Sequence, residues 1–131
     1  FLNRHKFNLQ KYSSSNLDKE SSAKLFHRNK ELFNSEDVYL NDHLTLKTVS
    51  KKLNVKSREI SQAINENTQQ NFYDFVNQYR IEKAQVLLKN SDYKKAKIAT
   101  IAYDSGFGNV TSFNLAFKKK TGLTPSAYRK T

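Results

Sequence analysis

Residues 98–129 read IATIAYDSGFGNVTSFNLAFKKKTGLTPSAYR, and this stretch decides the fold. Ile98 and Ile101 recur at helical spacing, which predicts a short helix that stops at Gly106 in the left-handed conformation. Asn109 is a residue type that caps helices, and a second helical pattern follows it. Two short helices joined by a tight turn are typical of a helix-turn-helix unit.

This unit spans about residues 97–121. Its second helix carries one apolar and one polar face. We expect its phenylalanines, with Phe107, to form the core rather than to stack on bases, because they recur at helical spacing. The outward residues are then candidate DNA contacts: Asn109, Val110, Thr111, Asn114 and Leu115. Val110 can equally be packed. Lys118, Lys119 and Arg129 are candidates for phosphate contacts, whereas Lys120 can face solvent.

Residues 45–68 repeat this pattern. Val49 to Val55 spans six residues, as does the interval from Ile101 to Phe107. Such a repeat predicts a second helix-turn-helix unit. With its apolar residues turned inward, the second helix of this unit leaves a polar face whose residue types pair with guanine and adenine edges: Arg58, Ser61, Gln62 and Asn65. An ordinary solvated polar face is the alternative.

A long helix joins the two units, over about residues 71–90. The stretch from Phe72 to Lys89 contains neither Gly nor Pro and carries a broad apolar stripe. Its length of roughly 27 Å, at 1.5 Å per residue, is close to one duplex turn of about 34 Å. We therefore expect it to hold two reading helices over successive major grooves.

The N-terminal segment is polar and carries few apolar residues, so residues 1–21 are interpreted as a linker or flexible tail. A helix of about three turns is expected from Ser22 to near Asn34, and the DNA-binding domain is assigned to residues 22–131. Thr124, a capping residue type, and Pro125, which suits the first helical position, predict a last short helix. The fold class is therefore all-α, with about seven helices in two helix-turn-helix subdomains and a long connecting helix.

Charge and composition restrict the function. The formal net charge is +11, and residues 94–131 alone carry +7. A run of charges is more often a solvated face than a binding site, but concentration of the charge on one segment is the pattern expected of a nucleic-acid binder. Cysteine is absent, so disulfides, thiolate zinc sites and the thiol acceptor of an alkyl-transfer repair enzyme are excluded. The three scattered histidines form no metal-ligand spacing, and no catalytic motif is present. We expect no enzyme activity, no metal and no cofactor, no membrane contact by this chain, and a cytoplasmic location.

The C-terminal third resembles the AraC/XylS family of transcription regulators. The residues that carry the resemblance are Ile101-Ala102, Gly106-Phe107, Ser112-Phe113, Ala116 to Lys119, Gly122 and Thr124 to Arg129. It extends over about residues 40–131. The resemblance implies a DNA-binding domain at the end of a longer protein that senses a ligand or signal. Lys11-Tyr12, Ser15 and Leu17 are similar to the segment before this domain in some membrane-anchored regulators.

Three residues depart from the family pattern. Ser50 stands where Ala is common, and Gln69 stands where a Gly often ends the first reading helix. A glutamine forced to positive φ there costs roughly 1 kcal/mol. Leu115 stands where many members carry Arg, so either a base contact is lost or an apolar contact to a thymine methyl replaces it.

These observations favour sequence-specific binding of double-stranded DNA by two major-groove helices, which regulates transcription. The alternative is a basic helical module that binds nucleic acid without sequence preference. RNA polymerase is a further candidate partner. We expect the chain to be part of a longer protein, since it begins at Phe1 without an initiator Met, and to be monomeric as it stands.

Overall fold

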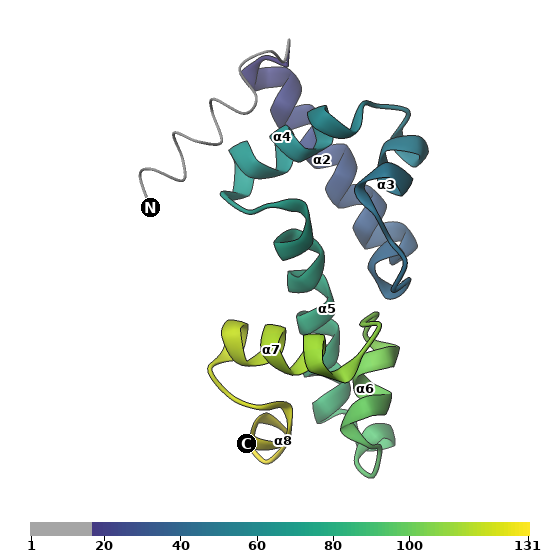
Figure 1. The fold of residues 1–131 in the computed structure, drawn as a ribbon, viewed down its shortest axis with the longest axis vertical. Coiled ribbons are helices and arrows are strands. Elements are labelled where there is room, and N and C mark those ends of the chain that lie inside the picture. Colours follow the sequence, from purple (N-terminus) through teal and green to yellow (C-terminus); the bar gives the residue numbers. More distant parts are fainter. Residues whose placement is uncertain (1–16) are drawn as a thin grey trace. The chain divides into compact units, whose positions relative to one another are not determined.

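The structure is a computed structural model that describes residues 17–131. This range holds seven α-helices, two short 3-10 helices and no strand (Figure 1). The α-helices are α2 (Lys19–Glu36), α3 (Leu46–Leu53), α4 (Ser57–Thr68), α5 (Phe72–Lys89), α6 (Ile98–Asp104), α7 (Val110–Thr121) and α8 (Pro125–Arg129). The 3-10 helices are η1 (Val38–Leu40) and η2 (Ser91–Tyr93). The predicted all-α class, with two helix-turn-helix pairs and a long connecting helix, is confirmed.

The described residues form two compact units, each with its own core. Unit 1 comprises residues 17–37 and 44–75, and unit 2 comprises residues 38–43 and 76–131. The helix-turn-helix pair of unit 1 is α3 with α4, and that of unit 2 is α6 with α7. The segment that contains η1 therefore belongs to unit 2, although it follows α2 in the chain.

The core of unit 1 forms where α2 packs against α4. In Figure 1, α2 is the long helix that passes behind α3 and α4. Phe33 of α2 is fully buried, and its ring lies 5.1 Å from that of Phe75 in an edge-on arrangement. Arg28 donates from Nη2 to the Leu53 carbonyl oxygen at 2.7 Å, which ties α2 to the end of α3. The long helix α2 thus completes a core that α3 and α4 alone would leave open.

The core of unit 2 contains the phenylalanines of the second helix-turn-helix pair. Phe113 and Phe117 are fully buried, and Phe107 is nearly so. Their rings form a chain with centroid separations of 5.2 Å between Phe107 and Phe113 and 5.6 Å between Phe113 and Phe117. Such aromatic contacts add stability beyond the burial of area. The prediction that these residues are core is confirmed.

Local capping signals position the helices of unit 2. The Asn109 side chain accepts a hydrogen bond from the Ser112 backbone N–H at 2.8 Å, which caps α7. The Thr124 hydroxyl accepts from the Ala127 N–H at 3.1 Å and caps α8. Gly106 has a φ of +101°, as its place after α6 predicts. Each of these features is encoded within a few residues of its position.

The start of the first helix differs from the prediction. Helix α2 begins at Lys19, three residues before the expected start at Ser22, and runs to Glu36. The Asp18 carboxylate accepts from the Ser21 N–H at 2.7 Å, and this bond lowers the pKa of Asp18. The predicted tail of residues 1–21 is therefore too long at its C-terminal end. Residues 1–16, with most of the segment that resembles membrane-anchored regulators, lie outside the described range.

The two departures in unit 1 have visible consequences. The Ser50 hydroxyl donates to the Val55 carbonyl oxygen, so this side chain braces the turn between α3 and α4. Gln69 follows α4 with a φ of 64°, in the left-handed region that favours glycine. The backbone strain expected from the sequence is present at this position.

We expect Gln69→Gly to raise the free energy of unfolding by about 0.5–1 kcal/mol, because it removes the strain of a Cβ at positive φ. The Gln69 side chain is exposed, so little packing is lost. Urea unfolding of the variant measures the change. The matched control is Gln70→Gly, at a neighbouring position without positive φ, which should be destabilising. If Gln69→Gly instead lowered the free energy of unfolding as much as Gln70→Gly, the assignment of strain to Gln69 would be refuted.

Candidate nucleic-acid interface

Helix α7 presents the polar face predicted from the sequence. Asn109, Thr111, Asn114 and Leu115 are exposed, whereas Phe113 and Phe117 of the same helix are buried. Val110, whose packing the sequence left open, is half-buried. The prediction of which side chains of α7 face outward is therefore consistent with the structure.

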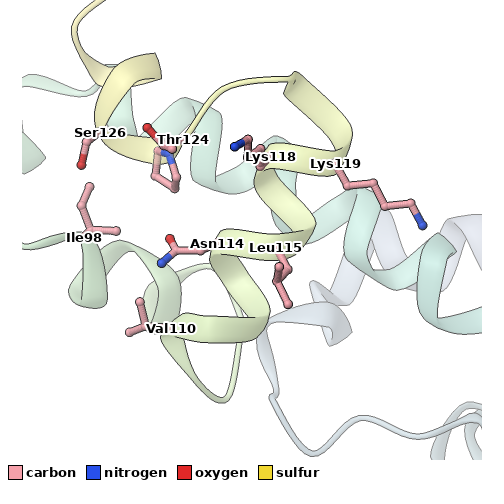
Figure 2. Close-up of a pocket in the computed structure, with 9 residues that line it drawn as sticks. Ile98, Val110, Asn114, Leu115, Lys118, Lys119, Thr124 and Ser126 are labelled. Carbon is pink, nitrogen blue, oxygen red and sulfur yellow. The ribbon is translucent and has the colours of Figure 1, made fainter.

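A groove runs along this face of α7. It has a volume of about 740 Å³ and is open on one side. Its walls come from α7, from Ile98 at the start of α6 and from the start of α8 (Figure 2). The lining residues are Ile98, Val110, Asn114, Leu115, Lys118, Lys119, Thr124, Pro125 and Ser126. Figure 2 shows Asn114 directed from α7 toward Ile98, whereas Leu115 leaves the helix on another side.

Positive charge borders the groove. Lys118 and Lys119 line it, and Lys120 is exposed on the following position of α7. The ion pairs found within residues 17–131 involve none of these lysines. Three unneutralised ammonium groups in the last turn of α7 favour contact with a polyanion.

Helix α4 of unit 1 presents a smaller polar face than predicted. Arg58 is exposed and Ser61 is half-buried, but Gln62 and Asn65 are only 4% and 7% exposed. The Gln62 amide donates from Nε2 to the Leu17 carbonyl oxygen at 3.4 Å and to Glu66 Oε2 at 3.2 Å. The expectation that Gln62 and Asn65 face outward was wrong.

The physical reason is the packing of α2 on α4. The apolar residues of α4 alone predict a narrower buried side. Because α2 covers α4 as well as α3, a wider arc of α4 is buried, and it includes two amide side chains. The apolar stripe of α2, with Leu25 and Leu32, was the signal that a further partner for α4 was needed.

Arg129 is also placed differently from the expectation. Its guanidinium donates from Nη2 to the Ala96 carbonyl oxygen at 2.8 Å, and the side chain is half-buried. This bond joins α8 to the segment before α6. We assign Arg129 to the stability of unit 2 and do not count it among the candidate phosphate contacts.

Arg80, on α5, binds backbone carbonyl groups of the η1 segment. In the structure it donates from Nε to the Tyr39 carbonyl oxygen at 2.7 Å and from Nη2 to the Asn41 carbonyl oxygen at 2.9 Å. The guanidinium carbon lies 5.7 Å from the centroid of the Phe107 ring. Burial lowers the pKa of Arg80, and the Asp42 charge opposes that change. Arg80 therefore holds the η1 segment within unit 2.

Residues 17–131 contain no group of three His, Asp or Glu side chains that could hold a metal ion. Within the same range, no helix combines the length and the apolar composition that a membrane crossing requires.

A family of helix-turn-helix domains matches residues 49–131 of the chain. The Msm operon regulatory protein of Streptococcus mutans is 31% identical over 87 residues, which cover 66% of this chain and 30% of that protein. The uncharacterised transcriptional regulatory protein YesN of Bacillus subtilis is 33% identical over 92 residues, which cover 69% of this chain and 24% of that protein. The chain thus spans less than a third of the length of these curated relatives.

Two solved structures are similar in fold and sequence. The C-terminal domain of AraT, a response regulator from Geobacillus stearothermophilus, has a TM-score of 0.70 at 28% identity and covers 88% of both chains. The C-terminal domain of the two-component response regulator yesN from Fusobacterium nucleatum has a TM-score of 0.67 at 35% identity. That match covers 78% of this chain and 98% of the other.

Proposed function

This chain belongs to the AraC-type helix-turn-helix family of DNA-binding transcription regulators, and from that premise we propose how it reads DNA. Helix α7 enters the major groove of double-stranded DNA as the principal reading helix, and α4 reads a second element. The observation that carries the proposal is the exposed polar face of α7, which lies over a groove bordered by lysines.

In unit 2, Asn114 is the residue best suited to direct base readout. Its exposed amide has the donor and acceptor that pair bidentately with adenine N6 and N7 in the major groove. Lys118 and Lys119 contact phosphates and position the helix without reading sequence. Thr111 and Asn109, which are also exposed, complete this set of contacts.

In unit 1, Arg58 carries most of the readout. An arginine fork bridges guanine O6 and N7, and Arg58 is exposed near the start of α4. Ser61 lies three residues further along the same helix and is half-buried. With Gln62 and Asn65 withdrawn into the core, we expect unit 1 to recognise fewer bases than unit 2.

The chain functions as one part of a longer regulator, in keeping with the lengths of its relatives. We further propose that it acts in the cytoplasm, that it folds as a monomer, and that RNA polymerase is a partner of the whole protein. The mass of one chain is 15.2 kDa, so sedimentation at twice that mass would contradict the monomer.

The direct test is affinity for a duplex selected from random sequence. We expect Asn114→Ala and Arg58→Ala each to weaken binding by about 1–3 kcal/mol, because each removes one bidentate base contact. The matched control for the first is Asn34→Ala, an exposed asparagine of α2 outside both reading helices, which should have no effect. Lys118→Ala should weaken binding to all duplexes alike. It should also reduce the salt slope, which is the slope of log affinity against log salt concentration, by about one.

The alternative function is binding without sequence preference, which the clustered lysines alone would support. It predicts equal affinity for every duplex, with ionic strength as the only strong dependence. That result would overturn the proposed regulatory function.

A further inference from the structure

Leu115 is an exposed apolar side chain of α7. It leaves 70% of its surface exposed on α7, although the same helix buries Phe113 and Phe117. A single exposed leucine is ordinary on a protein surface. Leu115, however, lines the groove described above, and the cationic side chains Lys118 and Lys119 line the same groove.

The chemistry of the groove restricts what Leu115 can contact. The lysines favour a polyanion, and a leucine side chain neither donates nor accepts hydrogen bonds. In the major groove, the 5-methyl group of thymine is the apolar group that a base edge presents. The position of Leu115 one turn after exposed Thr111 places it on the same side of α7 as a residue proposed to face DNA.

We propose that Leu115 contacts the 5-methyl group of one thymine and so makes unit 2 prefer thymine to cytosine at that position. This inference rests on the proposed function and assigns a specificity to one residue of it. The lysines hold the duplex against α7, and Leu115 gains contact area only where a methyl group projects from the base. Asn114 and Leu115 then read different bases, because consecutive residues leave an α-helix about 100° apart.

The test replaces each thymine of a selected duplex, one at a time, with deoxyuridine. This change removes only the methyl group and keeps base pairing. At one position within the element that unit 2 recognises, we expect about fourfold weaker binding, as loss of one buried methyl implies. Leu115→Ala should bind the thymine and deoxyuridine duplexes equally at that position.

The matched control is Val86→Ala, which truncates another exposed apolar side chain of unit 2, on α5. It should keep the full preference for thymine. Thermal unfolding of Leu115→Ala should match the parent chain, since the side chain is exposed.

Three outcomes overturn the proposal. The first is that replacement of each thymine with deoxyuridine leaves the affinity unchanged. The second is that Leu115→Ala still binds the deoxyuridine duplex more weakly than the thymine duplex. The third is that the element recognised by unit 2 contains no thymine. In each of these cases sequence-specific binding still stands. If no duplex is preferred over random sequence, the proposed function fails, and the Leu115 contact fails with it.

Discussion

Replacing Gly106 with alanine is expected to lower the free energy of unfolding of unit 2 by about 3 kcal/mol or more. Gly106 has a φ of +101°, which an L side chain rarely adopts. A Cβ there would overlap the carbonyl oxygen of Tyr39 and lie 3.0 Å from both Arg80 Nε and Leu40 Cα. Backbone atoms are among these neighbours, so a change of rotamer does not relieve the overlap. Urea unfolding followed by circular dichroism measures the loss.

Gly122 provides the matched control. It also has positive φ, at +80°, but an added Cβ would meet no heavy atom within 4 Å. Gly122→Ala should therefore cost about 1 kcal/mol, from backbone strain alone. Equal losses at the two glycines would contradict the close approach of η1 to Gly106.

The second large effect is expected at Arg80. Arg80→Ala should lower the free energy of unfolding by about 2–4 kcal/mol, because it removes two charge-assisted hydrogen bonds and leaves two carbonyl oxygens without them. The Tyr39 and Asn41 carbonyls both belong to the segment that Arg80 holds. Arg80→Lys should recover less than half of the loss, since an ammonium cannot reproduce the planar fork.

A readout from DNA binding separates this stabilising role from a phosphate contact. If Arg80 acts only within unit 2, Arg80→Gln, which removes the charge, should keep the parent chain's slope of log affinity against log salt concentration under conditions where the variant is folded. Glu82→Ala, at an exposed position of the same helix, is the stability control and should change little. A loss at Arg80→Ala of less than about 0.5 kcal/mol, within the range of ordinary surface substitutions, would contradict the assignment.

Helix positions were predictable where the signals are local. The boundaries of α5 agree with the sequence prediction, because the stretch from Phe72 to Lys89 has a helical stripe without Gly or Pro. The caps formed by Asn109 and Thr124 and the positive φ of Gly106 also depend on residues only a few positions away. The outward face of α7 followed from the spacing of its phenylalanines.

Side chains with distant partners could not be assigned in this way. Gln62 donates to Leu17, 45 positions away, and Arg80 donates to Tyr39, 41 positions away. Arg129 and Ala96 are 33 positions apart. Each of these residues is polar, so its type is compatible with an exposed site and with a buried hydrogen bond. Only tertiary packing distinguishes the two: that of α2 for Gln62, that of the η1 segment for Arg80, and that of the segment before α6 for Arg129.

The central claim is that two helices read two sequence elements, and selection of bound duplexes from a random pool tests it most directly. The selection is repeated with Arg58→Ala and with Asn114→Ala. We predict that the parent chain enriches a site with two separate elements, and that each variant loses the preference in one element while it keeps the other. Enrichment of a single element would contradict readout by both helices, and enrichment of none would contradict sequence-specific binding.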